Sequence, residues 1–399
     1  YHTIDMGRAG IVYINDYTNT VFVEREELGI PNAILPVSIS TFINGHTDYT
    51  TYGVGGRINY ESKLEYFSNT FVWDMFNGSS IRFHLDSNEG GLEKWVEYSY
   101  NPQGYTLWVD ADSSRNFIYS NNYIVDESGN KYSFNGDGYI VSITSGSNFN
   151  DKLTINYDNH KIDSITDNIG REFVFTYGSF ENLRGLSKIS INIHDSSAND
   201  SQILYDYKNI NQKLYLTKAT YADGKSVEYN YDSIGRLLSV KNIDNSIIEF
   251  NYAVSENTAQ KNKNPVYYGR INSYTKKVLD ADCYITEYIT TINVEYPYRR
   301  VFSERHYING TSESTKSNVN PFDEIIQFNR NLDVLYITDN SGNNIYADYD
   351  DNHNLLSLVT PIDEENLIIN GEMDRVGNKS SVPTHWNRIN ISNRPAANE

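Results

Sequence analysis

The chain has 399 residues, a formal net charge of −19 and an isoelectric point near 4.8. Nucleic acid phosphates bind to clustered basic surfaces, so this charge argues against a nucleic acid partner. The single cysteine, Cys283, excludes an internal disulfide and a zinc site built from several thiolates.

The sequence contains no run of about 18 apolar residues and no leader-peptide pattern. It therefore predicts neither a membrane-spanning helix nor a signal peptide. Because the chain begins at Tyr1 and not at Met, we expect it to be a piece of a longer protein whose export signal lies upstream. Tyr occurs 34 times, which fits many half-buried strand positions where the ring packs and the hydroxyl reaches water.

Residues 1–120 are rich in predicted strands. Ile11 to Ile14 and Val21 to Val23 flank Asn15 to Asn19, which has the composition of a hairpin loop. Further strands are predicted at Pro36 to Phe42 and at Gly53 to Tyr60. We interpret residues 1–120 as the lead-in or cap of a larger sheet.

Three tryptophans, Trp73, Trp95 and Trp108, fall in this first part of the chain. Large aromatic side chains can fill the end of a β-array as a hydrophobic plug, and they can also form a stacking platform for a sugar. The plug is the interpretation that we carry forward, and the sugar platform is the alternative.

The stretch Val227 to Tyr252 has the order strand, turn, strand, turn, strand. Its first strand alternates apolar and polar residues, as a half-buried strand requires. Asp232 can hydrogen-bond to its own backbone and Gly235 can adopt a positive φ, which together predict a hairpin turn. The spacing of Leu237 and Val240 breaks strict alternation, so we expect a bulge or a strand end there.

These residues resemble the YD repeat of the RHS (rearrangement hot spot) family. In that repeat a Tyr-Asp pair precedes Gly-Arg-Leu, and the unit ends on another Tyr. The matching positions in this chain are Tyr231, Asp232, Gly235, Arg236, Leu237 and Tyr252.

Degraded copies of the unit recur at a nearly constant spacing. The aromatic residues that bound a unit are 21 positions apart at Phe328 and Tyr349, as they are in the best-matched unit, and 20 apart at Tyr157 and Tyr177. A fixed period of this size marks a repeat architecture. The positions assigned in the copies are Tyr157, Asp158, Gly170, Arg171, Tyr177, Gly342 and Tyr349.

The resemblance implies an all-β fold: an antiparallel β-hairpin YD-repeat array that forms a curved, spiralling sheet, part of an RHS-type shell. We place this repeat sheet at residues 121–362. Residues 363–399 resemble the opening of jelly-roll carbohydrate-binding modules, from Asn366 to Met373 and again from Pro383 to Trp386. We expect only the truncated start of such a module, lying on the array or partly disordered.

The sequence offers little for catalysis. The eight histidines form no metal-ligand pattern, and no nucleophile motif is present, so we expect no catalytic residue, no metal and no cofactor. Two carboxylate pairs, Asp110 with Asp112 and Asp348 with Asp350, could be imagined as the acid and base of a glycosidase. Turn-flanking acidic strands give the same spacing by chance.

The resulting hypothesis is a non-catalytic segment of an encapsulating β-shell in a secreted or surface-attached bacterial protein. Its partner would be the rest of the parent polypeptide, including a possible cargo. The alternative is an adhesion or glycan-binding module, and a glycoside hydrolase ranks last. Since an excised array leaves an end strand unpaired, we expect that edge to be covered by the tail after Pro361 or by a second copy of the protein.

Overall fold

The computed structural model describes residues 1–30, 35–44, 49–50, 52–54, 56–75, 79–98, 104–110, 121–148, 150–192, 201–253, 270–279, 285–295, 298–308, 317–338, 342–350, 355–361 and 386–390. Cys283, Asp112 and most of the predicted C-terminal module lie outside these ranges.

The chain divides into two compact units. Unit 1 comprises Tyr1–Ile14, Thr20–Ile248 and Glu256–Gly269. Unit 2 comprises Asn15–Asn19, Glu249–Ser255 and Arg270–Glu399.

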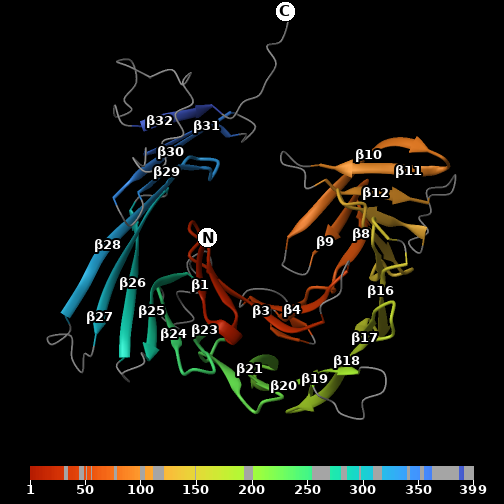
Figure 1. The fold of residues 1–399 in the computed structure, drawn as a ribbon, viewed down its shortest axis with the longest axis horizontal. Helices are drawn as coiled ribbons and strands as arrows, with labels where there is room; N and C mark the ends of the chain where they lie inside the picture. The colour runs from red at the N-terminus through yellow and green to blue at the C-terminus, as the bar shows by residue number, and fades with distance from the viewer. Residues whose placement is uncertain are drawn as a thin grey trace, which may run out of the picture. The chain divides into compact units, whose positions relative to one another are not determined.

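Nearly all of the described structure is antiparallel β (Figure 1). The 3-10 turn whose residues are all described is η1 (Gly7–Ala9). The prediction of an all-β chain built from antiparallel hairpins is therefore confirmed. It succeeds because apolar and polar residues alternate along most strands, which gives each strand one face to bury.

A small five-stranded sheet comes first, in the order β1-β2-β3-β4-β7. Its strands are β1 (His2–Asp5), β2 (Ile11–Ile14), β3 (Val21–Ile30), β4 (Val37–Asn44) and β7 (Gly56–Ile58). Two short strands, β5 (Tyr49–Thr50) and β6 (Gly53–Val54), pair with each other. The predicted loop Asn15–Asn19 joins β2 to β3, and its Asn15 side chain accepts hydrogen bonds from the backbone N–H groups of Tyr17 and Thr18.

A large sheet begins at β8 (Lys63–Phe67), within the range predicted as lead-in, and adds strands in chain order. Its further strands in unit 1 are β9 (Thr70–Asp74), β10 (Ser80–Glu89), β11 (Leu92–Glu97), β12 (Thr106–Val109), β13 (Tyr123–Val125), β14 (Lys131–Phe134), β15 (Ile140–Thr144), β16 (Lys152–Asp158), β17 (Lys161–Thr166), β18 (Glu172–Phe180), β19 (Leu183–Asn192), β20 (Gln202–Ile210), β21 (Lys213–Tyr221), β22 (Ser226–Tyr231) and β23 (Leu237–Lys241).

The strand β24 (Ile247–Tyr252) begins in unit 1 and ends in unit 2. The strands that follow in unit 2 are β25 (Ile271–Leu279), β26 (Ile285–Glu295), β27 (Arg299–Ile308), β28 (Ser317–Phe328), β29 (Val334–Thr338), β30 (Asn344–Tyr349), β31 (Leu355–Pro361) and β32 (Trp386–Asn390). Because β32 pairs with β31, a strand after Pro361 covers the edge of β31, as expected for the tail.

Two kinds of tight turn connect the hairpins. In the first kind, two consecutive residues have positive φ, as Asn159 and His160 do between β16 and β17. The same two-residue turn occurs at residues 68–69, 90–91, 181–182 and 211–212. Its backbone twist matches the right-handed twist of the strands that it joins.

The second kind has five residues, and we call it the repeat turn. The N–H of its first residue donates to the carbonyl of the fifth, and the N–H of the fourth donates to the carbonyl of the first. In the large sheet the repeat turn occurs at residues 126–130, 135–139, 167–171, 221–225, 232–236, 242–246 and 329–333. The residue at its fourth position has positive φ in all seven: Gly129, Gly138, Gly170, Gly224, Gly235, Asn245 and Leu332.

A one-residue shift in strand register recurs beside the aromatic residue that bounds each repeat. Tyr231 pairs with Leu237 while its neighbour Asn230 pairs with Ser239, so Leu238 is an extra residue. This confirms the bulge predicted in that segment. The same shift occurs at Phe134, Tyr157, Tyr177, Tyr207, Phe328 and Tyr349, each opposite an aliphatic residue. We call the face of the large sheet that carries these residues the aromatic face.

Candidate functional site

The repeat turn at residues 232–236 is held by a buried ion pair. Asp232 Oδ1 accepts hydrogen bonds from the backbone N–H groups of Ile234 and Arg236, at 3.1 and 2.8 Å. Asp232 Oδ2 accepts one from Arg236 Nε at 2.6 Å, and the two side chains are 1% and 7% exposed. Gly235 lies at φ 91°. The Asp, Gly and Arg of the repeat motif therefore stabilise a turn, which is a structural role. We call these hydrogen bonds of the first side chain, to two backbone N–H groups and to the fifth side chain, the clasp.

The repeat turn at residues 167–171 has the same clasp. Asp167 Oδ1 accepts from the backbone N–H groups of Ile169 and Arg171, at 3.0 and 2.9 Å, and Arg171 Nε donates to Asp167 Oδ2 at 2.6 Å. Sequence reasoning selected Gly170 and Arg171 but missed Asp167, although its spacing to them equals that of Asp232 to Gly235 and Arg236. The structure places Asp158 elsewhere, exposed and next to a two-residue turn.

In unit 2 the turn at residues 329–333 has the same clasp, but Asn329 stands in the position of the Asp and Asp333 in the position of the Arg. Asn329 Oδ1 accepts from the backbone N–H groups of Asn331 and Asp333, at 2.8 and 2.9 Å, and Asn329 Nδ2 donates to Asp333 Oδ2 at 2.8 Å. Gly342, at φ 81°, lies just before β30, and Tyr349 lies at the register shift that ends β30.

The two tyrosines of the repeat that best matches the YD motif, residues 231–252, occupy equivalent positions at the ends of two strands. Tyr231 ends β22 and Tyr252 ends β24, and both side chains are half-buried. The ring of Tyr231 packs against that of Tyr215 with centroids 5.0 Å apart, and Leu237 opposite it is buried. Aromatic pairs at this distance add to the stability gained from burial alone.

In unit 1 the small sheet covers part of the aromatic face. Arg25 of β3 donates from Nη1 to the Tyr229 hydroxyl at 2.9 Å, and that hydroxyl donates to the carbonyl of Ala9 in η1 at 2.9 Å. Burial raises the pKa of Tyr229, while Arg25 opposes the rise. The small sheet is thus fixed to β22 by buried hydrogen bonds.

The charge of Arg25 is balanced within the same strand. Glu27 Oε1 accepts hydrogen bonds from Arg25 Nε at 2.9 Å and from Thr41 Oγ1 at 2.5 Å. The Arg25 guanidinium also lies over the rings of Tyr205 and Tyr229, at 5.7 and 5.4 Å from their centroids. A buried pair of this kind is costly to break, because each charge left alone would be desolvated without compensation.

Further contacts extend this cover along the sheet. The hydroxyl groups of Tyr52 and Tyr177 lie 3.1 Å apart. Gly53 of β6 lies so close to Tyr207 that an added Cβ would be 3.2 Å from the ring. In unit 1, then, the chain's own first strands and loops occupy the tyrosine-bearing surface.

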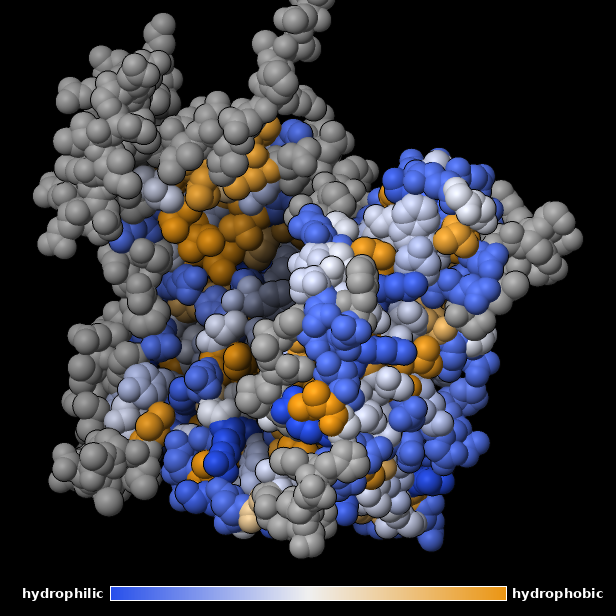
Figure 2. Space-filling model, turned by 45° about the vertical axis from the view of Figure 1, so that its right-hand side comes forward, coloured by the Kyte–Doolittle hydropathy of each residue, from blue (hydrophilic) through white to orange (hydrophobic). Residues whose placement is uncertain are grey.

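In unit 2 the aromatic face is less covered. Ile337 pairs with Ile345, and Ala347 pairs with Leu358, so these four side chains share that face. All four are half-buried. Apolar side chains gather on part of the molecular surface in Figure 2. A face of this composition can hold an apolar segment of another polypeptide.

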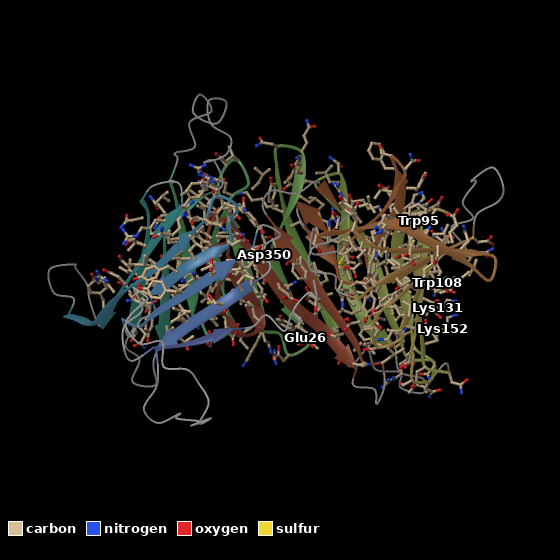
Figure 3. The ribbon with its side chains drawn as sticks, turned by 90° about the horizontal axis from the view of Figure 1, so that it is seen from above. Glu26, Trp95, Trp108, Lys131, Lys152 and Asp350 are labelled. Atoms are coloured by element: carbon tan, nitrogen blue, oxygen red, sulfur yellow. The ribbon has the colours of Figure 1, made fainter. Side chains whose placement is uncertain are left out.

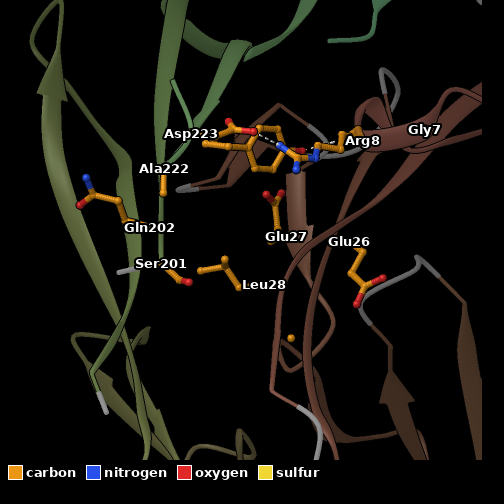
Figure 4. A pocket seen from close by; sticks show the side chains of 11 residues that line it. Gly7, Arg8, Glu26, Glu27, Leu28, Ser201, Gln202, Ala222 and Asp223 are labelled. Atoms are coloured by element: carbon orange, nitrogen blue, oxygen red, sulfur yellow. Dashed lines mark hydrogen bonds and ion pairs between the residues drawn. The ribbon is translucent and has the colours of Figure 1, made fainter. Parts of the chain in front are cut away.

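A cavity of about 500 Å³ lies between β3, β20 and β21 in unit 1 (Figure 4). An exposed ion pair, Arg8 Nη1 with Asp223 Oδ2 at 2.7 Å, lies on its wall, and Glu26 and Glu27 also contribute. The hydrogen bond from Arg8 lowers the pKa of Asp223. Polar and apolar atoms contribute about equally to the wall, and its charged groups are already largely paired.

Two of the tryptophans predicted as a plug are buried. Trp73 packs against Tyr105 with centroids 5.2 Å apart, and Trp95 packs against Phe71 at 5.0 Å. Trp108 is half-buried and stacks on Tyr123 of the neighbouring strand β13. Figure 3 labels Trp95 and Trp108, which come from the paired strands β11 and β12. Burial of Trp73 and Trp95 fits the plug better than a sugar platform.

Within the described ranges, no three His, Cys, Asp or Glu side chains come close enough together to hold a metal ion. No helix in the described part of the chain has the length and apolar character needed to cross a membrane. Asp348 and Asp350 lie on and just after β30, and the other carboxylate pair considered for a glycosidase includes Asp112, outside the described residues.

The fold and the clasped turns define a class of protein: a sheet of repeated antiparallel hairpins in which an aromatic residue marks each register shift. The resemblance to the RHS/YD-repeat family in the sequence is thus matched by a recurring structural unit. No protein-family model and no curated protein matches the chain.

Solved structures with a similar arrangement include the N-terminal domain of the effector protein SpvB from Salmonella typhimurium strain LT2. It is 8% identical with a TM-score of 0.36, and the match covers 49% of this chain and 98% of that one. TcdB2-TccC3 without its hypervariable C-terminal region is 8% identical with a TM-score of 0.33, over 89% of this chain and 23% of that one.

The Photorhabdus luminescens Tc holotoxin pore is a third similar structure, 10% identical with a TM-score of 0.32. The match covers 89% of this chain and 19% of the other. The chain therefore spans about a fifth of the length of these toxin chains.

Proposed function

We propose that this chain is a non-catalytic shell segment of a secreted or surface-attached bacterial protein, and that the aromatic face of unit 2 holds another part of the parent polypeptide. The supporting observation is a difference in cover between matched positions of the two units. The aromatic face is buried where the small sheet covers β22 and β23 in unit 1, whereas β29, β30 and β31 in unit 2 carry half-buried apolar side chains on that face.

The match is position by position. In unit 1, Tyr229 and Val240 face each other across β22 and β23 and are 1% and 0% exposed. In unit 2 the equivalent pairs, two residues from the register shifts, are Ala347 with Leu358 and Ile326 with Ile337. Ala347, Leu358 and Ile337 are half-buried, and Ile326 is 3% exposed. The position on β22 and β23 is therefore covered, whereas the equivalent positions on β28 to β31 are partly open.

The partner that suits this surface is an extended or incompletely folded polypeptide with apolar side chains. Apolar burial supplies most of the free energy of such contacts, at roughly 25 cal/mol per Å² removed from water. A sheet face without a deep pocket contacts many residues weakly, which favours retention of a segment over chemical action on it.

The test is binding of a permanently unfolded polypeptide, reduced and carboxymethylated lactalbumin, measured by fluorescence anisotropy. Ile345→Lys places a charge on the aromatic face, and we expect it to weaken binding at least tenfold. Tyr346→Lys is the matched control, because Tyr346 is on the opposite face of the same strand and is exposed. Equal binding by both variants would contradict the proposed surface.

A second assay addresses the alternatives. Purified protein is screened against a glycan array and a panel of polysaccharide, peptide and phosphoester substrates at micromolar concentration. We expect no turnover on any of them. Hydrolysis abolished by a single Asp or Glu substitution would overturn the proposal, and binding of a glycan without hydrolysis would move the assignment to adhesion.

A further inference from the structure

We propose that strands β8 to β15 of the large sheet form a ring closed by a pH-sensitive contact, which we call the seam. The seam is formed in acid and opens when Glu61 ionises. The seam is the contact of Ser62–Leu64 with Gly138–Ile140. It lies within unit 1 and is independent of the function proposed above.

The seam is a short ladder of backbone bonds. The N–H of Leu64 donates to the carbonyl of Gly138 at 2.8 Å, and the N–H of Ile140 donates to the carbonyl of Ser62 at 3.4 Å. Lys63 and Tyr139 form the single bridge between them. Every other neighbouring pair of strands from β8 to β15 has at least three paired residues. The seam is therefore the weakest joint in this ring of strands.

Gly138 makes the close approach possible. It occupies the fourth position of a repeat turn at φ 84°, and an added Cβ would lie 2.2 Å from the carbonyl oxygen of Leu64. Any other residue would have to push β8 away from the turn. The seam thus depends on one backbone contact that a single methyl group would prevent.

Glu61 immediately precedes the seam and has an unsatisfied oxygen. Its Oε2 is buried and has no hydrogen-bond partner. A cavity of about 180 Å³ lies beside it, and its lining includes Arg57, Lys63, Asp74 and Tyr139. A neutral carboxyl group tolerates this position far better than a carboxylate does, because burial penalises the charged form.

The groups packed around Glu61 compensate a charge there only in part. Arg57 of β7 is the basic group that acts on it, and Arg57 already donates to the carbonyl of Met75 at 3.3 Å. The Tyr157 and Tyr177 hydroxyls donate to the carbonyls of Ile140 and Ile162, both at 2.8 Å.

The remaining groups near Glu61 are also engaged or of the wrong charge. Tyr52 Oη lies against the Tyr177 hydroxyl. Lys63 Nζ pairs with Glu65 at 2.5 Å, and Asp74 is acidic. Water that hydrates an ionised Glu61 would enter the adjoining cavity, whose wall includes Ser62, Lys63 and Tyr139 of the seam.

The direction of the effect follows from linkage. Burial raises the pKa of Glu61 from 4.5 to about 7, against opposing effects of the Ile58 backbone and Arg57. Because the closed form binds the proton more tightly, its stability is fully present below pH 4.5 and is lost as pH rises through 7. These two pKa values make opening about tenfold more favourable at pH 8 than at pH 6.

Hydrogen exchange read by mass spectrometry on the full chain tests the proposal. We expect the protection of the Leu64 and Ile140 amides, corrected for the intrinsic rate, to fall about tenfold from pH 6 to pH 8. In Glu61→Gln the same amides should show equal protection at both pH values. Amides at the β11–β12 pairing serve as the internal reference and should not change.

Gly138→Ala provides a test that does not depend on titration. We expect it to reduce protection at the seam at both pH values and to leave the β11–β12 amides protected. A wild-type seam whose protection does not change with pH, or a Glu61→Gln variant that keeps the wild-type dependence, would overturn the proposal. Should Gly138→Ala not fold, the comparison of wild type with Glu61→Gln decides alone.

Discussion

The fourth position of the repeat turn shows how far a single residue can be predicted from sequence. Gly235 was expected at positive φ because an Asp three positions earlier and an apolar strand on either side mark a hairpin turn, and it lies at 91°. Leu332 occupies the same position at φ 73°, which no propensity rule predicts for a leucine. The sequence predicts the turn where Gly occupies the fourth position. Where another residue stands there, the turn is recognised only from the backbone conformation.

Substitutions at two glycines distinguish backbone strain at positive φ from a steric clash of the added Cβ. Both Gly224 and Gly235 have positive φ, but an added Cβ meets nothing at Gly224 and would lie 2.1 Å from the Tyr215 hydroxyl at Gly235. We expect Gly224→Ala to lower the free energy of unfolding by about 1 kcal/mol. Gly235→Ala should cost at least twice as much in a urea titration. Equal losses would mean that Tyr215 moves aside freely.

Leu332→Gly should stabilise the protein. The leucine is 46% exposed, so its removal loses little burial, while its left-handed backbone is relieved. After the entropy cost of glycine, we expect a gain of about 0.5 kcal/mol in the free energy of unfolding. Leu238→Gly is the control: that residue is also partly exposed, at 37%, but lacks the positive φ and should lose stability on the same scale.

At the scale of the hairpin, the residues that form the repeat could be identified from the amino-acid sequence only in part. The clasp at residues 232–236 lies where the motif predicts it, but in the preceding copy the clasping acid is Asp167 and not Asp158. Asp158 follows a tyrosine as the motif requires, yet the next two residues form a two-residue turn that leaves no role for it. The spacing of acid, Gly and Arg was the reliable signal, because the geometry of the turn requires it.

The two aspartates should therefore respond differently to neutralisation. Asp232→Asn keeps an oxygen for the backbone N–H groups but removes the carboxylate charge that pairs with the buried Arg236, and we expect a loss of about 3 kcal/mol. Asp158→Asn should change stability by less than about 0.5 kcal/mol, since Asp158 is exposed. Thermal unfolding at pH 7 measures both. A large loss at Asp158 would restore it to the motif.

At the scale of the molecule, the sequence could not reveal which surfaces cover one another. Arg25 and Tyr229 are 204 residues apart, and neither carries a local pattern that predicts their hydrogen bond. The same limit applies to Glu61, which acts on Tyr157 and Tyr177 of distant strands. Periodicity predicts that a strand has an inner face, but the element that covers that face is decided by tertiary packing.

Removal of the tail should expose an adhesive edge. β32 pairs with five residues of β31, from Ser357 to Pro361, and a chain ending at 361 would leave their backbone groups unpaired. We expect that truncation to self-associate as concentration rises, seen by sedimentation velocity. A chain ending at 390 keeps β32 and is the control. Monomeric behaviour of both at equal concentration would show that β31 needs no cover.

The register shift beside each bounding aromatic residue limits how such an array can change length. Each shift offsets two strands by one residue at the same place in the unit, so the inward and outward sides of the following strands stay in phase. Loss of a complete hairpin preserves that phase, whereas loss of an odd number of residues inside a strand would turn the apolar side chains outward. Growth and shortening of the array are therefore quantised in whole hairpins.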